Sequence, residues 1–587
     1  MHTCTVIVLC GAVVQLAWGY AQPGSVSGPT QPSGDPVAVT PLGSVKGSWM
    51  TSRRGRRFEA YRGVRYAQPP VGELRFQPPK PVSSYEGEVD AREEGPACPQ
   101  PTTPGYFVDE DCLRLNVYTP NKRSAKPLPV VVFIHHGGFY VASGRSDVAG
   151  PHYFMDRDMV LVTINYRLAS LGFLSTGDKL APGNNGFKDQ VAALRWVRDN
   201  IAAFGGDPNC VTLMGYSAGL HVLSPISKGL FHRAVSMSAS PFSQVVINHD
   251  QFHLAKKQAE LVGCPTTDSK AIMDCLKTVP WKKLGDSLPG FTELGTDPVL
   301  VWTPVVENDF GQERFLPQHP LELLRDRKLQ SMPFIISQTR NEFFWMANNI
   351  LNNATLLEMM NKDWNKIAPI SFLLPRNDDR PARVLREKFI GEGSLKKDAK
   401  TTDVLTKLYG DSFVGFGVHR LANLMCRHSK QPVYYYEFDY MGQHSFYEDP
   451  VTKKPTGVAH HDDLIYMFSI RALFPDIGLT GPDATMVDKM TAIIYNFARH
   501  GDLNPHGDLP ELEGLSWPPM VPKQRNYLKL SSYFSVHQNL SEDRFRVWDD
   551  LFPIDYNLGK SARSRSDCTV NIYGNRDGRN IIVYCDY

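Results

Sequence analysis

Residues 215–219 read Gly215-Tyr216-Ser217-Ala218-Gly219, and they follow directly on the apolar run Val211-Thr212-Leu213-Met214. An apolar strand that breaks into Gly-x-Ser-x-Gly is typical of a nucleophile elbow. A serine hydroxyl is a weak nucleophile, so it must project from a sharp turn toward a base, and that strained turn needs small neighbours. Because the motif also occurs in ordinary loops, the prediction depends on an oxyanion loop, an acid and a histidine elsewhere in the chain.

Other apolar runs predict buried strands on both sides of this stretch. The predicted strands are residues 130–134, 160–164, 211–214, 334–337 and 433–438. Residues 189–204 predict a helix, because apolar residues recur there at spacings of three and four and Gly205-Gly206 ends the run. Apolar strands that alternate with helices indicate an α/β fold with a large, mostly parallel central sheet flanked by helices on both faces.

Several further motifs occur in the order of a known family. They are residues 63–70 (Gly-Val-Arg-Tyr-Ala-Gln-Pro-Pro), 110–113 (Glu-Asp-Cys-Leu), 165–168 (Asn-Tyr-Arg-Leu), 171–174 (Leu-Gly-Phe-Leu) and 186–208, which precede the elbow. Over about residues 37–555 the chain resembles the type-B carboxylesterase (cholinesterase-like) family, and it looks nearest to the secreted carboxylesterases of invertebrates. This resemblance implies an α/β-hydrolase fold and the hydrolysis of carboxylic esters.

The candidate oxyanion loop follows the first predicted strand and reads His-His-Gly-Gly-Phe at residues 135–139. Acyl transfer needs backbone N–H donors that point at the negative oxygen of the tetrahedral intermediate. The loop resembles the family's His-Gly-Gly-Gly-Phe, with His136 in place of the first glycine. The resemblance implies an oxyanion hole made by the N–H groups of Gly137, Gly138 and Ala218. We expect His136 to narrow the rim of the pocket; an additional catalytic base is the alternative.

The candidate acid and base come later in the chain. Glu342 ends Thr-Arg-Asn-Glu just after strand 334–337, and His460 lies in Gly-Val-Ala-His-His-Asp-Asp-Leu at residues 457–464. The order Ser217, Glu342, His460 fits a hydrolase triad. The family has one histidine, a small residue and two acids here, which indicates His460. His461 takes the place of the small residue and is the alternative base, and two surface histidines on an acidic loop are the non-catalytic interpretation.

The roles follow from this assignment. His460 would take the Ser217 proton and later protonate the leaving alcohol, while Glu342 orients the imidazole and an acyl-serine forms in between. Such a mechanism requires no metal and no cofactor, and the cysteines show no paired metal-ligand spacing.

The cysteines fall into three groups. By resemblance, Cys98 pairs with Cys112 and Cys264 pairs with Cys275. Cys210 is expected to be a buried free thiol, and Cys426 has no obvious partner. The loop between Cys98 and Cys112 holds no tryptophan, which argues against a quaternary-ammonium substrate bound there by cation–π contact.

The C-terminal tail lies outside the resemblance. Residues 569–573 and 580–584 read as two strands, and Cys568 and Cys585 flank them. Pairing the two cysteines places Val570 opposite Val583, so a disulfide-closed hairpin is predicted. A disordered basic tail with either cysteine bonded to another chain is the alternative.

The N-terminus predicts the compartment. Residues 1–19 carry no acidic residue, Lys or Arg and are largely apolar, which indicates a secretory signal peptide. Residues 20–36 are a Gly/Ser/Pro-rich linker, residues 37–555 the hydrolase domain and residues 556–587 the tail. We therefore expect a secreted protein without a membrane span, with glycosylation acceptors at Asn353 and Asn539. The net charge of +2 offers no basic face for nucleic acid.

The segment after the elbow departs from the family. Only Leu220-His221-Val222 separate Gly219 from Leu223-Ser224-Pro225, about five residues fewer than usual. Five residues are not a whole number of helical turns, so the sequence predicts a helix of barely two turns that ends near Leu223. A void or a displaced neighbouring helix is expected behind it.

The sequence supports three candidate functions. The leading hypothesis is a secreted serine carboxylesterase acting on uncharged carboxylic esters, including xenobiotics. A dedicated hormone or pheromone esterase is the alternative within the same class. A catalytically weak or inactive adhesion ectodomain is the alternative from another class, and the retained Ser217, Glu342 and His460 argue against it.

Overall fold

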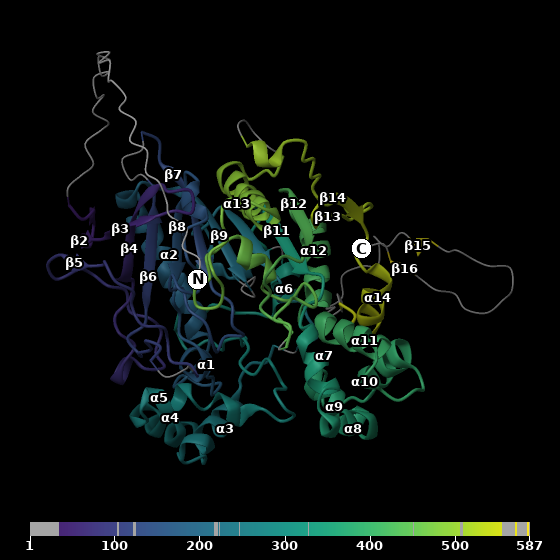
Figure 1. The fold of residues 1–587 in the computed structure, drawn as a ribbon. Coiled ribbons are helices and arrows are strands. Elements are labelled where there is room, and N and C mark those ends of the chain that lie inside the picture. Colours follow the sequence, from purple (N-terminus) through teal and green to yellow (C-terminus); the bar gives the residue numbers. More distant parts are fainter. Residues whose placement is uncertain are drawn as a thin grey trace, which may run out of the picture. The chain divides into compact units, whose positions relative to one another are not determined.

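The central element is a sheet of 11 strands. Its strands are β3 (Ser48–Thr51), β4 (Arg57–Arg65), β6 (Arg114–Thr119), β7 (Leu128–Ile134), β8 (Val160–Ile164), β9 (Gly206–Tyr216), β10 (Arg233–Met237), β11 (Phe334–Thr339), β12 (Val433–Phe438), β13 (Asn526–Leu530) and β14 (Ser535–Gln538). Their spatial order is β14-β13-β12-β11-β10-β9-β7-β8-β6-β4-β3 (Figure 1). The elbow strand β9 therefore lies in the middle of the sheet.

The computed structural model describes most of the chain. The described residues are 34–101, 105–120, 125–216, 221, 223–245, 247–326, 328–449, 451–504, 509–554, and the backbone of 570–571 and 584–585. Ser217 and Ala218 lie outside them, as do the predicted signal peptide and nearly all of the linker.

The strands from β8 to β13 in this order run parallel to their neighbours. The outer pairings β6–β8, β4–β6, β3–β4 and β13–β14 are antiparallel. The predicted, mostly parallel sheet is confirmed, and the strands predicted at 160–164 and 433–438 have the expected bounds. A smaller sheet is formed by β1 (Val37–Thr40), β2 (Gly43–Lys46) and β5 (Val89–Asp90).

Side chains of the central strands alternate between two apolar layers. In β7, Val130 and Val132 pack into one layer, which includes helix α2 (Asn185–Asn200). Val131 and Phe133 pack into the other, which includes helix α13 (Pro482–His500). Because successive residues of a strand point to opposite faces, both faces need a helical cover, and a continuous apolar strand is the result.

Helix α2 shows how the predicted pattern folds. It begins at Asn185, four residues before the predicted start, and its α-geometry ends at Asn200. A 3₁₀ turn (Ile201–Phe204) continues it, and Gly205 closes the end with φ of 82°. A residue with positive φ at a helix end is normally glycine, which explains the glycine pair that ends the pattern.

The remaining helices gather mainly in two groups. The first contains α3 (Phe252–Val262), α4 (Ser269–Thr278) and α5 (Trp281–Gly285), and the second α7 (Phe344–Leu351), α8 (Ala354–Lys362), α9 (Trp364–Ser371), α10 (Arg380–Leu385) and α11 (Ala399–Gly410) (Figure 1). Helices α1 (Ala169–Phe173), α6 (Pro320–Arg325), α12 (Phe416–His428) and α14 (Glu542–Leu551) complete the set among the described residues. The second group has an apolar core of its own, to which α14 contributes Phe545 and Trp548.

Two disulfides are present, Cys98–Cys112 and Cys264–Cys275. They are the two pairs that the resemblance implies. Cys210 and Cys426 are free thiols. The prediction that Cys210 is a free thiol is confirmed, but the residue is half-buried and not buried, and its sulfur contacts the Ala498 carbonyl and the Arg233 guanidinium.

The segment after the elbow is described only in part, because residues 217–220 and 222 lie outside the described residues. His221 and Leu223 have 3₁₀ geometry and Ser224 is extended before a further 3₁₀ turn at Pro225–Ser227, so helical geometry ends at Leu223, where the end was predicted. The predicted length of two turns stays a prediction. His221 is buried, and its two ring nitrogens bond Gln190 (2.6 Å) and Ser227 (3.0 Å). The His221 ring and the Leu223 side chain therefore both belong to the buried interior, and the predicted void behind this segment stays a prediction.

The tail contains a short antiparallel pairing of β15 (Val570–Asn571) with β16 (Tyr584–Cys585). Val570 lies opposite Cys585, not opposite Val583, so the predicted register is wrong by two residues. A shift of two keeps the same residues on the same face, so the apolar pattern cannot distinguish the two registers. The predicted Cys568–Cys585 disulfide involves Cys568, which lies outside the described residues.

No helix within the described ranges has the length and apolar character needed to cross a membrane.

Candidate active site

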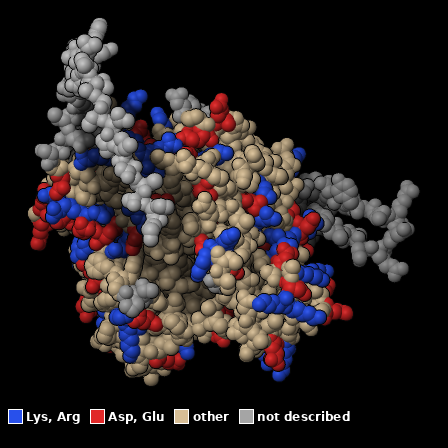
Figure 2. Space-filling view, viewed as in Figure 1, with Lys and Arg blue, Asp and Glu red and all other residues tan. Residues whose placement is uncertain are grey.

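A cavity of about 460 Å³ opens beside the parallel strands. Its wall includes Gly137, Gly138, Ser238, His460 and His461. Most of the other lining side chains are apolar or aromatic, and the rings of Trp345 and Tyr447 stack with centroids 3.4 Å apart. No Asp, Glu, Lys or Arg occurs among the described lining residues. On the face shown in Figure 2, by contrast, charges of both signs are interspersed over the surface.

His460 and Glu342 meet at this cavity. Nδ1 of His460 lies 2.5 Å from Oε2 of Glu342, and both residues are 3% exposed. The backbone brings them together, because Asn341 and Ala459, the residues just before each, form a parallel β-bridge. Two segments 118 residues apart in sequence therefore place a carboxylate directly against an imidazole.

Glu342 accepts two further hydrogen bonds on its other oxygen. Oε1 receives the Thr339 N–H at 2.7 Å and the Ser238 hydroxyl at 2.6 Å. The Glu342 carboxyl group therefore accepts hydrogen bonds on both of its oxygens, which fixes its orientation toward His460. Ser238 has no sequence signature that would have identified it: it lies in the loop after β10 and was missed by the sequence analysis.

His461, the alternative base, has different contacts. Its backbone N–H donates to the Tyr216 hydroxyl at 2.7 Å, and its ring centroid lies 4.0 Å from that of His460. Burial, together with the neighbouring histidines, lowers the pKa of His461 well below its usual value. The carboxylate of Glu342 contacts His460 instead.

His136 lines the cavity next to His461, and the two ring centroids are 4.2 Å apart. Burial lowers the pKa of His136 to about 3. Its ring is therefore neutral at neutral pH. The two histidines that depart from the family pattern thus contact each other and form one side of the cavity wall.

The loop after β7 presents two backbone N–H groups to the cavity. Within the described part of the chain, no acceptor bonds the N–H of Gly137 or Gly138. The loop turns tightly, with the Gly137 carbonyl accepting from Tyr140 (2.9 Å) and Val141 (3.0 Å). A Cβ on Gly137, whose φ is 114°, would lie 2.0 Å from the Val141 carbonyl oxygen. Glycine is required there by both conformation and space.

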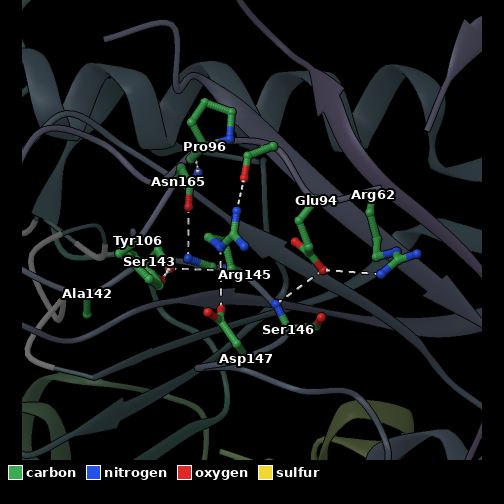
Figure 3. Close-up of polar contacts among 12 residues, drawn as sticks. Arg62, Glu94, Pro96, Tyr106, Ala142, Ser143, Arg145, Ser146, Asp147 and Asn165 are labelled. Carbon is green, nitrogen blue, oxygen red and sulfur yellow. Dashed lines mark hydrogen bonds and ion pairs between the residues drawn. The ribbon is translucent and has the colours of Figure 1, made fainter. Parts of the chain in front are cut away.

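Side chains anchor the chain just beyond this turn. Gln100 holds Ala142 with two hydrogen bonds. Further anchors are Asn165 on Gly144, and Tyr106 on Ser143 and Glu94 on Ser146 (Figure 3). Arg145 lies in the middle of this network beside Asp147 (Figure 3), with its guanidinium 5.4 Å from the centre of the Tyr106 ring. Gln100 and Tyr106 both belong to the loop that the Cys98–Cys112 disulfide closes. That loop therefore fixes the position of the turn at Gly137 and Gly138.

Two buried acids follow His461. Asp462 accepts from the backbone N–H groups of Ala459 and Phe446 and from the Ser445 hydroxyl, and burial raises its pKa to about 7. Burial and the negative charge of Glu342 raise the pKa of Asp463 to about 8. Asp463 accepts only the Tyr436 hydroxyl among the described residues, and its Oδ1 is buried without a partner.

The raised pKa of Asp463 predicts a pH-dependent stability. An unfolded aspartate has a pKa of about 3.9, so between pH ~4 and ~8 only the native state keeps this proton. The contribution to the free energy of unfolding is complete below pH ~4 and is lost as pH rises toward 8. We expect Asp463→Asn, which is neutral throughout, to gain stability relative to wild type between pH 5 and pH 8. Denaturant unfolding at pH 5 and pH 8 measures the free energy of unfolding of both proteins. If the difference between them is the same at the two pH values, the prediction is contradicted.

The fold and the site together define an α/β-hydrolase: a mostly parallel sheet with helices on both faces, a carboxyl group just after β11 that contacts an imidazole, and a glycine turn whose N–H groups bond no acceptor among the described residues. Residues 34–548 match the profile of the carboxylesterase family. The chain is 35% identical to the juvenile hormone esterase of Tribolium castaneum over 81% of this chain and 85% of that protein. It is 34% identical to a carboxylic ester hydrolase of Bombus ignitus over 89% and 95% of the two chains.

Among solved structures, the juvenile hormone esterase of Manduca sexta with covalently attached OTFP superimposes with a TM-score of 0.78 at 27% identity, covering 88% of this chain and 100% of that one. The chain belongs to the carboxylesterase family, and it is a carboxylic ester hydrolase with the α/β-hydrolase fold.

Proposed function

We propose that the protein is a secreted serine carboxylesterase that hydrolyses uncharged carboxylic esters through an acyl-serine intermediate. In this proposal Ser217 is the nucleophile, His460 the general base and Glu342 the acid that orients it. The observation that carries the proposal is the 2.5 Å contact between Glu342 and His460 at a cavity whose wall also holds Gly137 and Gly138. Ser217 enters on the sequence motif and on its place one residue after β9.

The chemistry follows from the roles of the ring nitrogens. Because Nδ1 of His460 is bonded to Glu342, its Nε2 is the nitrogen that takes the Ser217 proton as the oxygen attacks the ester carbonyl. The N–H groups of Gly137, Gly138 and Ala218 hold the oxyanion, and each is worth about 3 kcal/mol of barrier. The proton then passes to the leaving alcohol, and water attacks the acyl-serine by the same route to release the acid.

The cavity wall supports an uncharged substrate. Apolar and aromatic side chains can bury hydrocarbon, and no charged side chain occurs among the described lining residues to pair with an ionic substrate. A cavity of about 460 Å³ falls within the ordinary range for small-molecule sites. The substrate class proposed is therefore a neutral ester with an apolar acyl or alcohol group.

Secretion is part of the proposal. Residues 1–19 are proposed as the signal peptide, 20–36 as a linker, 37–555 as the hydrolase domain and 556–587 as the tail. Two disulfides fit an oxidising compartment. Asn353 and Asn539, the proposed glycosylation sites, are both exposed. Asn353 uses only its side-chain oxygen to cap α8, which leaves the amide nitrogen for a glycan.

A serine-reactive organophosphate tests the catalytic proposal directly. The secreted protein is incubated with the probe, digested, and the adduct is mapped by mass spectrometry. We expect a single covalent adduct at Ser217 with parallel loss of ester hydrolysis, and no adduct in Ser217→Ala. Absence of an adduct in wild type at high probe concentration would refute the serine mechanism and favour the adhesion alternative.

A dedicated hormone esterase is the second candidate within the class, because two relatives above are named juvenile hormone esterases. The test compares kcat/KM for a juvenile hormone ester with that for simple nitrophenyl esters. A preference of about 100-fold or more for the hormone would support the dedicated function. Comparable values would support a general carboxylesterase.

The anchoring of the oxyanion loop predicts an effect of Gln100. Its side-chain amide bonds both the N–H (2.8 Å) and the carbonyl (2.9 Å) of Ala142. Gln100→Leu removes both bonds, so the proposed N–H donors should lose alignment and kcat should fall about tenfold, the scale of one or two buried hydrogen bonds. Gln258→Leu is the matched control, because Gln258 on α3 is also buried and its side chain exchanges two hydrogen bonds with Ser287, which lies just after α5. Equal losses in both variants would contradict a role of Gln100 in the oxyanion hole.

A further inference from the structure

Tyr216 links the end of β9 to the residues around Glu342 and His460. It is the last residue of β9, it directly precedes Ser217, and its side chain is 1% exposed. Its hydroxyl accepts the His461 N–H at 2.7 Å and donates to the Ser238 hydroxyl at 3.1 Å. The Ser238 hydroxyl in turn donates to Glu342 at 2.6 Å. Every donor in this chain of three hydrogen bonds points toward the carboxylate.

These contacts close a circuit around the candidate base. Starting at His460, the circuit runs through Glu342, Ser238 and Tyr216 and returns to the peptide N–H of His461, the next residue after His460. A hydroxyl that accepts one hydrogen bond becomes a stronger donor in the next one, so the hydrogen bonds of this buried circuit strengthen one another. The circuit fixes the acid relative to the base through Ser238 and through the peptide next to His460.

Two strained residues belong to the circuit. His461 has φ of 83° and Ser238 has φ of 48°, which are unfavourable for residues with a side chain. Such conformations persist only where surrounding contacts determine them. The Tyr216 hydroxyl bonds the backbone of the first and the side chain of the second. It therefore acts at the two points where the backbone would otherwise relax.

The ring of Tyr216 adds a contact with the base itself. Its centroid lies 4.9 Å from that of His460 with an interplanar angle of 76°, and 4.9 Å from that of His461. This packing restricts how the imidazole of His460 can tilt. The ring and the hydroxyl thus act on His460 by separate contacts. Tyr216→Phe removes the hydroxyl and keeps the ring, so it tests the hydroxyl alone.

We propose that Tyr216 is a positioning residue for the Glu342–His460 pair. The inference rests on the proposed function, in which that pair activates Ser217. One side chain joins the three segments of the proposed triad: it belongs to the strand that leads into Ser217, it reaches Glu342 through Ser238, and it holds the peptide next to His460. Tyr216 touches neither substrate nor reacting atoms in this proposal.

The first test is Tyr216→Phe, which keeps the ring packing and removes the hydroxyl. We expect kcat to fall about 10- to 100-fold while KM stays within about twofold, because alignment of the base matters in the transition state and not for substrate binding. Tyr434→Phe is the matched control: Tyr434 is equally buried in β12 and donates to Asp502 at 2.9 Å, away from the site. An unchanged kcat in Tyr216→Phe, or an equal loss in Tyr434→Phe, would overturn the proposal.

A double-mutant cycle tests whether Tyr216 acts through Ser238. Ser238→Ala breaks the next link of the same chain, so the two losses should overlap, and the double variant should lose clearly less than the product of the single losses. If the loss of kcat in the double variant equals the product of the two single losses, the two residues act independently, and the circuit is overturned. Melting temperatures of all variants establish that the folded fraction is the same.

A spectroscopic readout separates this proposal from the proposed function. The proton between His460 Nδ1 and Glu342 Oε2 should resonate far downfield in the proton NMR spectrum, and Glu342→Gln assigns it by its loss. We expect the resonance to move in Tyr216→Phe and to stay in place in Tyr434→Phe; an unmoved resonance overturns the positioning role. If the organophosphate leaves Ser217 unlabelled, the proposed function fails, yet this measurement still decides whether Tyr216 positions the pair.

Discussion

Replacing His460 with Ala is expected to lower kcat by about four to six orders of magnitude, the scale seen when a triad histidine is removed from a serine hydrolase. The reason is the 2.5 Å contact of His460 with the Glu342 carboxyl group, which neither His136 nor His461 makes within the described part of the chain. KM should change little. The measurement is turnover of a neutral nitrophenyl ester, with the melting temperature as a check on folding.

His461→Ala is the matched control for that variant. His461 is adjacent in sequence, lines the same cavity and lies in the same loop. Its main polar contact is made by the backbone N–H to Tyr216, which alanine retains, so we expect a loss of less than about tenfold. The reverse result, a severe loss in His461→Ala and a mild one in His460→Ala, would show that His461 is the base.

His136→Ala completes the comparison. An efficient general base has a pKa near the working pH, whereas burial lowers the pKa of His136 to about 3. The ring therefore serves as part of the cavity wall. We expect its removal to change the relative kcat/KM of small and bulky esters without abolishing turnover.

Local patterns predicted the central sheet well. The strands at 160–164 and 433–438 have their predicted bounds because each is a short run of mostly apolar, β-branched or aromatic residues, followed directly by a polar residue, Asn165 or Asp439. The helix over 189–204 was also found, and it extends to Asn185. Those first residues are buried by contacts with distant segments, such as Asn185 with the Phe76 carbonyl, which no local periodicity contains.

The site was only partly predictable for the same reason. The order of Ser217, Glu342 and His460 follows from motifs, but the circuit through Ser238 and Tyr216 depends on the meeting of β9, the loop after β10 and the loop at Ala459. The burial of His221 was not predicted either, because it depends on hydrogen bonds of the ring with Gln190 and Ser227, which no local pattern contains. A buried histidine of this kind looks like any other histidine in the sequence.

Replacing Glu342 with Gln is expected to lower kcat by about 10⁴-fold, although the side chains have the same shape. The carboxylate accepts from three donors: the Thr339 N–H, the Ser238 hydroxyl and Nδ1 of His460. A glutamine amide has one oxygen and one NH₂ group. If its oxygen meets Thr339 and Ser238, its NH₂ faces His460.

That orientation reverses the imidazole tautomer. Nδ1 would have to accept the amide proton, so the ring proton would move to Nε2, and the nitrogen that should take the Ser217 proton would already carry one. If the amide is flipped instead, its NH₂ meets two donors in a buried site, and each unmet hydrogen bond costs about 1–3 kcal/mol. Either arrangement removes the anion that would stabilise the imidazolium in the transition state.

Glu342→Asp provides the graded comparison. It keeps the negative charge and the acceptor pattern but withdraws them by one methylene, and a misplacement of about 1 Å in a catalytic array costs on the order of 100-fold. We therefore expect kcat to decrease in the order wild type, Glu342→Asp, Glu342→Gln. Asp483→Asn is the matched control, since Asp483 is a buried carboxylate on α13 that accepts from Tyr440 and Gln443 and does not line the cavity. Equal turnover in the Gln and Asp variants would show that geometry alone, and not the charge and tautomer set by Glu342, limits the reaction.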